Sequence, residues 1–224
     1  MPNMAFLVKL RRYFMKELYQ DLWQTKRGSH FGLDLKAYFL KTEEGNALIY
    51  YTTEKEELSR IQEMGGVKYQ CLSHHHEVNE FLNISKRILG AELCCHRNCA
   101  PYLEGIAQAD TLFDKDTSLP GGLRILETPG HTNSNVCYFY ESPYGKNYLF
   151  SGDTIYLDKG EWNYLIMNQE GGNPADLKES LLKIKDLDVD VIMCSVAVGH
   201  NDAVEVSRGE WRQIIDRLVN KLGV

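Results

Sequence analysis

Three of the seven histidines in this 224-residue chain lie in one stretch, Ser73-His74-His75-His76-Glu77-Val78-Asn79. The stretch follows residues 67–72, whose apolar composition predicts a short β-strand. Imidazoles gathered at the end of a strand are typical of a metal site at the edge of a sheet. In an extended backbone, His74 and His76 project to one side and His75 to the other. We therefore expect His74 and His76 to share a metal ion, and His75 to be exposed or hydrogen-bonded to the backbone.

Three later segments have the same form, a short loop that carries a potential metal ligand after a predicted strand. They are Thr128-Pro129-Gly130-His131-Thr132, Ser151-Gly152-Asp153-Thr154 and Val198-Gly199-His200. If the strands before them run in one direction, their carboxyl ends meet at one edge of a sheet. The sequence then predicts one metal site built from five side chains: His74, His76, His131, Asp153 and His200.

The hydrophobic pattern predicts two similar halves of strands and helices. Strands are predicted at 35–41, 47–52, 67–72, 91–95, 123–128, 136–140, 148–151 and 189–194. Helices are predicted after Thr53 and at 81–89, 100–107, 174–187 and 211–222, while residues 5–27 fit a helix and an edge strand equally well. Such a pattern favours two sheets packed face to face with helices outside. We expect a single domain over residues 1–224, with 1–34 as an N-terminal extension or edge strand.

Two helix starts have specific capping patterns. Thr53 and Glu56 have the spacing of a capping box, and Asn173 with Pro174 has the form of an N-cap followed by a first-turn proline.

The composition excludes several classes of function. A net charge of −6 argues against a nucleic-acid surface, and no apolar run approaches the roughly 20 residues that span a bilayer. The apolar N-terminus lacks the preceding charges of an export signal, so a cytoplasmic location is expected. In that compartment the six cysteines are expected to be free thiols.

The four motifs, in this order, resemble those of the metallo-β-lactamase superfamily, which includes glyoxalase II. The family's first motif is Thr-His-x-His-x-Asp-His, and residues 128–132, 151–154 and 198–200 are similar to its later ligand loops. The resemblance covers roughly residues 35–205 and implies an α+β fold, a four-layer αβ/βα sandwich of two mixed sheets. It also implies that His74, His76 and His131 hold a first metal, that Asp153 touches two metals, and that His200 belongs to the second.

This chain departs from the first motif at Val78 and Asn79, where the family has aspartate and histidine. Valine has no lone pair to offer, and an asparagine amide is a poor zinc ligand. We therefore expect one divalent transition metal, or none if the site is inactive; the surviving ligands suit zinc first, with iron or manganese as alternatives. Tyr51 also stands where many members of the family have an acidic residue.

The resemblance implies a metal-dependent hydrolase that attacks an ester, thioester or similar acyl bond of a small molecule through metal-activated water. Asp153 would orient the water, accept its proton or bind the metal, and Glu77 or Glu80 is a candidate base. Trp162, Tyr164 and Met167 are expected to line either the substrate pocket or the core.

Two alternatives remain open from the sequence. A degenerate site without the family's aspartate is compatible with a non-catalytic or binding protein. His74, His131 and Asp153 also match the two-histidine, one-carboxylate set of mononuclear iron oxygenases, and persulfide dioxygenases of the superfamily are similar in using one iron.

Overall fold

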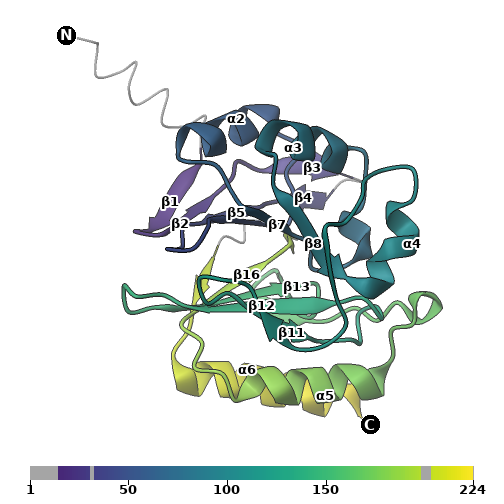
Figure 1. Ribbon diagram of the computed structural model, residues 1–224. Helices are drawn as coiled ribbons and strands as arrows, with labels where there is room; N and C mark the ends of the chain where they lie inside the picture. Colours follow the sequence, from purple (N-terminus) through teal and green to yellow (C-terminus); the bar gives the residue numbers. More distant parts are fainter. Residues whose placement is uncertain (1–14, 31–32, 198–202, 224) are drawn as a thin grey trace.

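Two β-sheets lie face to face in the middle of the molecule, and helices cover their outer sides (Figure 1). The structure is a computed structural model that describes residues 15–30, 33–197 and 203–223. The layers confirm the predicted αβ/βα sandwich of two mixed sheets. The assignment of residues 1–224 to a single domain stays a prediction.

The first sheet has seven strands and contains the strand that precedes the three histidines. Its spatial order is β1 (Lys16–Tyr19), β2 (Leu22–Gln24), β5 (Tyr38–Leu40), β6 (Ala47–Ile49), β7 (Tyr69–Cys71), β8 (Glu92–His96) and β9 (Thr111–Phe113). Strands β6 to β9 run parallel to one another, whereas β1, β2 and β5 pair antiparallel. In the undecided segment at residues 5–27, the described part is thus an edge hairpin rather than a helix.

The second sheet has six strands and contains the strands before the later motifs. Its order is β10 (Thr117–Ser118), β11 (Arg124–Glu127), β12 (Val136–Glu141), β13 (Asn147–Gly152), β16 (Val191–Cys194) and β18 (Val204–Glu205). Since β11 and β13 both pair antiparallel with β12, and β13 pairs parallel with β16, these three strands run in one direction. Their carboxyl ends therefore meet at one edge, as the loop pattern required.

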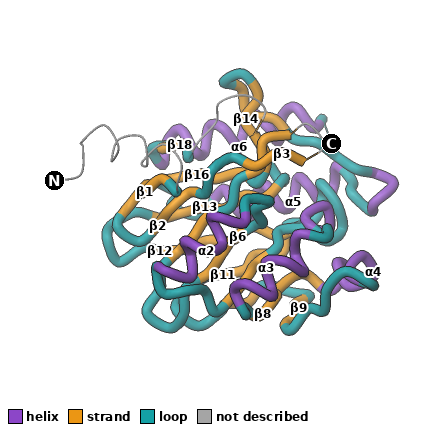
Figure 2. Tube along the Cα trace, turned by 90° about the horizontal axis from the view of Figure 1, so that it is seen from above, coloured by secondary structure: helices purple, strands orange, loops and turns teal. Residues whose placement is uncertain are grey.

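Helices complete the outer layers. Helices α2 (Lys55–Glu63) and α3 (Phe81–Leu89) lie next to each other across the first sheet, which is clearest from above (Figure 2). Helices α5 (Pro174–Lys185) and α6 (Arg208–Leu222) cover the second sheet (Figure 1). Smaller elements lie at the rim: α4 (Ala100–Leu103), the sheet β3 (Gly28–His30), β4 (Leu33–Leu35) and β17 (Val196–Ala197), and the hairpin β14 (Tyr156–Asp158) and β15 (Glu161–Asn163).

Local capping predictions had mixed outcomes. The Asn173 side chain accepts a hydrogen bond from the Asp176 amide, as expected, and Gly90 ends α3 with a left-handed φ of 64°. The predicted capping box at Thr53 is wrong, because Glu54 is the residue before the first turn of α2. The amide of Glu54 donates a hydrogen bond to the side chain of Thr52. The reciprocal box is found at α6, between Ser207 and Glu210.

Aromatic side chains fill the space between the two sheets. Tyr38 and Tyr50 of the first half meet Phe150 of the second, with ring centroids 5.7–6.5 Å apart in edge-to-face arrangements. All three side chains are fully buried. This packing fixes the distance between the edges of the two sheets, and the predicted ligands lie where those edges meet.

Candidate metal centre

The first histidine segment does not stay extended after β7. His74 is extended, with φ −165° and ψ 176°, but the chain then folds into a 3-10 turn, η1 (His75–Glu77). The alternation of an extended strand is therefore the wrong reason for pairing His74 with His76. Their rings nevertheless lie together, with centroids 4.8 Å apart, and the ring of His131 lies 5.1 Å from His74 and 5.3 Å from His76.

Two contacts between the halves bring the later loops to the histidines. The amide of Val136 donates to the carbonyl of Ser73 over 2.8 Å, and the amide of Gly152 donates to the buried Tyr50 hydroxyl over 2.8 Å. Gly152 has a φ of +53°, and a Cβ added there would lie 2.7 Å from the Ser73 Cβ. Only glycine allows the loop of Asp153 to approach the residue before His74 so closely.

The four predicted side chains in the described part of the chain surround one point. The nearest oxygen of Asp153, Oδ2, lies 3.5 Å from His74 Nε2 and 3.7 Å from His131 Nε2. His131 Nε2 lies 3.4 Å from His76 Nδ1. Together these atoms form a group that can hold a metal ion. The fifth predicted ligand, His200, lies outside the described residues.

The second ring nitrogen of each histidine has its own partner. His131 Nδ1 donates to the Leu165 carbonyl over 2.8 Å. Nδ1 of His74 lies 2.9 Å from the hydroxyl of Ser73, which donates in turn to the buried carboxylate of Glu77. His76 Nε2 bonds Glu170. Outer partners of this kind orient imidazoles and fix which nitrogen keeps its lone pair for a metal.

Burial and charge shift the titration of these groups strongly. Burial alone would lower the pKa of His74, but the Asp153 carboxylate outweighs it and raises that pKa to about 9. Burial would raise the pKa of Asp153, yet the imidazoles of His74 and His131 and the Ser195 hydroxyl hold it well below its usual value. Burial also lowers the pKa of His131 to about 4, so this ring is neutral at pH 7.

The donor set fits a divalent transition metal. A tetrahedral site with bonds of 2.0–2.1 Å has edges of roughly 3.3–3.4 Å. Three of the separations between the four donor atoms are close to this length, at 3.4–3.7 Å, and all four atoms lie within 4.8 Å of one another. Nε2 of His74 is buried and has no hydrogen-bond partner among the described residues. Its 3.5 Å contact with Asp153 has the length of an ion pair rather than of a well-formed hydrogen bond. A buried ring nitrogen left in this way is the atom to which a metal ion would bind in place of a proton.

His75 does not have the expected role. Its side chain is buried, stacks on Tyr102 with centroids 4.0 Å apart, and bonds the side chains of Ser134 and Glu170 instead of the backbone. His75, His76 and Glu170 form a second group of potential ligands. The sequence does not single out Glu170, because it follows no motif and lies 94 residues from His76.

The substituted motif positions lie beside the metal group without contributing donors to it. Val78 packs against the apolar cluster under α3 and lines the pocket. Asn79 accepts a hydrogen bond from the Phe81 amide and donates to the Glu77 carbonyl, so it organises the start of α3. Glu77 is buried behind His74, whereas Glu80 lies at the start of α3 and is not among the pocket's lining residues.

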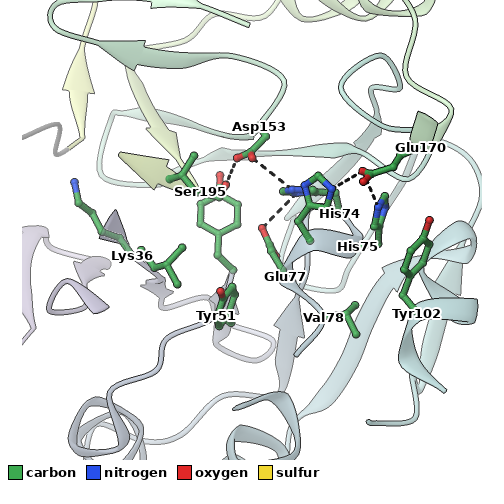
Figure 3. A pocket seen from close by; sticks show the side chains of 14 residues that line it. Lys36, Tyr51, His74, His75, Glu77, Val78, Tyr102, Asp153, Glu170 and Ser195 are labelled. Atoms are coloured by element: carbon green, nitrogen blue, oxygen red, sulfur yellow. Dashed lines mark hydrogen bonds and ion pairs between the residues drawn. The ribbon is translucent and has the colours of Figure 1, made fainter. Parts of the chain in front are cut away.

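A pocket of about 430 Å³ opens over the group (Figure 3). Its lining includes both ligand candidates and apolar or aromatic side chains: Leu35, Tyr51, Val78, Tyr102 and Val196. Trp162, Tyr164 and Met167 are not among the lining residues, and the first two pack against the core beneath α5 and α6.

The family model described as "Metallo-beta-lactamase superfamily" matches residues 40–196. The chain belongs to the metallo-beta-lactamase superfamily. The predicted resemblance to this superfamily is thereby confirmed, and the matched range contains the first three motifs but not residues 198–200.

Individual members of the metallo-beta-lactamase superfamily resemble the chain at low identity. A hydroxyacylglutathione hydrolase of Hydrogenovibrio crunogenus is 24% identical over 193 residues, which are 83% of this chain and 63% of that protein. The chain thus spans less than two thirds of that relative's length.

Solved structures of the superfamily show the same fold. A metallo-beta-lactamase from Pontibacter korlensis has a TM-score of 0.70 at 17% identity. The similarity covers 93% of the present chain and 98% of the Pontibacter chain. The metallo-beta-lactamase FIM-1 from Pseudomonas aeruginosa, in its mono-zinc form, has a TM-score of 0.70 at 15% identity. This similarity covers 94% of the present chain and 96% of the FIM-1 chain.

The described part of the chain contains no helix long and apolar enough to cross a membrane. Five of its cysteines are buried and Cys194 is partly buried, all as free thiols.

Proposed function

We propose that this protein is a metal-dependent hydrolase that cleaves an ester, thioester or similar acyl bond of a small molecule, with one divalent metal at the centre. The observation that carries this proposal is the gathering of four donor atoms from His74, His76, His131 and Asp153 within 4.8 Å of one another beneath an open pocket. Zinc is the first choice for three imidazoles and one carboxylate, and iron and manganese also suit this set.

A metal bound there would polarise an acyl carbonyl and lower the pKa of water toward ~7. The carboxylate of Asp153 is ionised and is held by the Ser195 hydroxyl, so its geometry is fixed before substrate binds. Its lowered pKa makes it a weak proton acceptor, which favours a role in ligation and in orienting water over a role as general base.

The pocket supports an acyl substrate with an apolar portion. Val78 and Tyr51 form apolar wall where other members of the superfamily carry polar metal-site residues, and Leu35 and Val196 extend this wall. The name of the hydroxyacylglutathione hydrolase relative describes thioester cleavage, and a thioester is accordingly the first substrate class to test. A cytoplasmic location, expected from the sequence, would fit such a substrate.

A single metal is proposed because the second position lacks its usual donors. Val78 offers none, and both polar groups of the Asn79 amide bond the backbone at the start of α3. His200 stays a predicted ligand from the sequence.

The test combines metal content with activity. Purified protein loaded with zinc, iron or manganese is expected to hold one ion per chain, by elemental analysis, and to cleave members of a panel of thioesters, esters and lactones. His131→Ala is expected to lower metal affinity and activity at least 100-fold, since it removes one of three imidazoles. His96→Ala is a control, because His96 bonds Glu127 away from the pocket.

Two results would redirect this proposal. Two full equivalents of tightly bound metal would contradict the one-metal site. Oxygen uptake on a persulfide with no hydrolysis by the iron-loaded protein would favour a sulfur dioxygenase, whereas metal binding without turnover on either panel would favour a binding protein.

A further inference from the structure

The carboxylate of Glu170 contacts two neighbouring imidazoles through one oxygen. Its Oε2 bonds Nε2 of His76 and lies 3.1 Å from Nε2 of His75. Figure 3 shows the contact between Glu170 and His75. Glu170 belongs to the 3-10 turn η3 (Asn168–Glu170), which lies in the loop between β15 and α5. The side chain therefore approaches the histidine stretch from the other half of the chain.

Backbone contacts hold this loop firmly against the loop of His131. The Asn133 amide donates to the Glu170 carbonyl over 3.1 Å, and the Met167 amide donates to the His131 carbonyl over 2.9 Å. A Cβ added to Gly172 would lie 2.2 Å from the His131 carbonyl oxygen. The Glu170 side chain is thus placed by the same loop packing that places a predicted metal ligand.

The protons of His76 can be assigned from its contacts. A neutral imidazole carries one N–H and one lone pair. An ionised carboxylate only accepts hydrogen bonds, so His76 Nε2 is the nitrogen that donates to Glu170. The lone pair is then on Nδ1, which faces His131 Nε2 across 3.4 Å in the metal group.

The contacts of His75 agree with the same direction of donation. The Ser134 hydroxyl accepts from the His75 amide over 3.2 Å and lies 2.8 Å from His75 Nδ1. That hydroxyl can donate its own proton to Nδ1, which leaves the N–H of His75 on Nε2, facing Glu170. Glu170 accordingly accepts an N–H from each ring.

We propose that Glu170 is a positioning residue: its carboxylate holds His76 in the tautomer whose Nδ1 lone pair points into the metal centre. This inference rests on the proposed function for the identity of that centre. A carboxylate behind a histidine ligand also raises the basicity of the ligating nitrogen, and losing such a partner typically weakens metal binding about 10–100-fold.

The same three side chains could instead hold a second ion, with Glu170 as a direct ligand. His76 argues against this arrangement, because a neutral ring has one lone pair and cannot bind one metal through Nδ1 and another through Nε2. Without His76, the ion would have only His75 and Glu170 as protein ligands, and two ligands are too few for tight binding.

The first experiment reads the tautomer directly in the metal-free protein. Long-range proton–nitrogen correlation NMR distinguishes a protonated Nε2 from a protonated Nδ1. We expect the wild type to show His76 with its proton on Nε2, and Glu170→Ala to show a mixture of both tautomers. Gln169→Ala is the matched control, since Gln169 is exposed on the same turn.

The second experiment titrates the metal-free proteins with Zn²⁺ and with Co²⁺. Glu170→Ala is expected to bind Zn²⁺ about 10–100-fold more weakly and to change the visible spectrum of the Co²⁺ form. Glu170→Gln keeps an acceptor without its charge, so a smaller loss is expected. Gln169→Ala is expected to match the wild type in both titrations.

The outcomes separate this inference from the proposed function. An unchanged His76 tautomer and unchanged Zn²⁺ affinity in Glu170→Ala would overturn the positioning role. A second equivalent of metal in the wild type, lost in both His75→Ala and Glu170→Ala, would overturn it by making Glu170 a ligand. A wild type that binds no metal would contradict the proposed function, while the NMR comparison would still decide how Glu170 acts on His76.

Discussion

Asn79 and Val78 occupy the positions at which this chain departs from the superfamily motif, and the structure gives each a local purpose. The Asn79 side chain bonds the backbone on both sides of the start of α3, and Val78 packs with the apolar residues under that helix. Each substitution thus replaces a metal donor by a contact that stabilises the fold. At the scale of single residues, the site is simpler than the family pattern but is not left with unsatisfied groups at these positions.

Replacement of Asn79 tests whether its side chain stabilises the start of α3 or binds a metal ion. Asn79→Ala removes the acceptor of the Phe81 amide, so the free energy of unfolding in urea is expected to fall by about 0.5–2 kcal/mol, the usual cost of a lost helix-start acceptor. Asn79→Asp keeps the acceptor and is expected to lose less. Metal content is expected to be equal in both variants, and a loss of metal at unchanged stability would identify Asn79 as a ligand.

The shifted pKa of His74 predicts how metal binding depends on pH. With a pKa of about 9, this ring is protonated at pH 7 in the metal-free protein, and a metal ion must displace that proton. Zinc affinity is therefore expected to rise about tenfold per pH unit up to about pH 9, with one proton released per ion. Calorimetry in buffers of different ionisation enthalpy measures that proton, and a pH-independent affinity would contradict the prediction.

The ion pair of His74 with Asp153 also predicts how the stability of the metal-free protein depends on pH. The pKa of His74 is raised above its ordinary 6.5, so its contribution is complete below that pH and is lost as the pH rises through about 9. The pKa of Asp153 is lowered below its ordinary 3.8, so its contribution is present above that pH and is lost as the pH falls further. Their attraction is therefore fullest between these limits.

At the scale of elements, the site depends on how closely the end of β13 approaches the end of β7. Gly152→Ala places a Cβ 2.7 Å from Ser73 in a backbone with φ +53°. Gly145→Ala is a matched control, since its φ of +86° carries comparable strain but nothing lies within 4 Å of the added Cβ. Backbone strain is expected to lower the free energy of unfolding of both variants by about 1–2 kcal/mol. Their melting temperatures are expected to fall accordingly.

Only Gly152→Ala is expected also to weaken zinc binding, because it separates Asp153 from His74. Equal zinc affinities in the two glycine variants would show that the close approach of the loops does not set the geometry of the site.

The elements also show which features a sequence can predict. The strands before His74, His131 and Asp153 follow from apolar runs. The shared direction of β11 and β13 was only a condition of the prediction, and it is known from the antiparallel pairing of both strands with β12. The η1 turn does not follow, because it depends on contacts such as Val136 with Ser73, 63 residues apart along the chain. Hydrogen bonds to partners so distant have no local pattern.

For the whole molecule, the layer order was predictable because two similar halves of strands and helices have few ways to bury their apolar faces. The short rim strands were not, since two- and three-residue segments such as β17 and β18 are too brief to have a hydrophobic period. Glu170 was not predictable for a related reason: its partners belong to the opposite half, and a single glutamate in a polar loop has no distinguishing spacing.

The division of the metal ligands between the two sheets has a consequence for how the two halves of the chain associate. His74 and His76 belong to the half of the chain that builds the first sheet, whereas His131 and Asp153 belong to the half that builds the second. Each half thus supplies two of the four donors in the described residues, and two protein ligands are too few to bind an ion tightly. The free energy released when an ion is captured is therefore also free energy of association between the two halves. If the chain were expressed as two fragments divided between β9 and β10, zinc would act as the ligand that promotes their reunion.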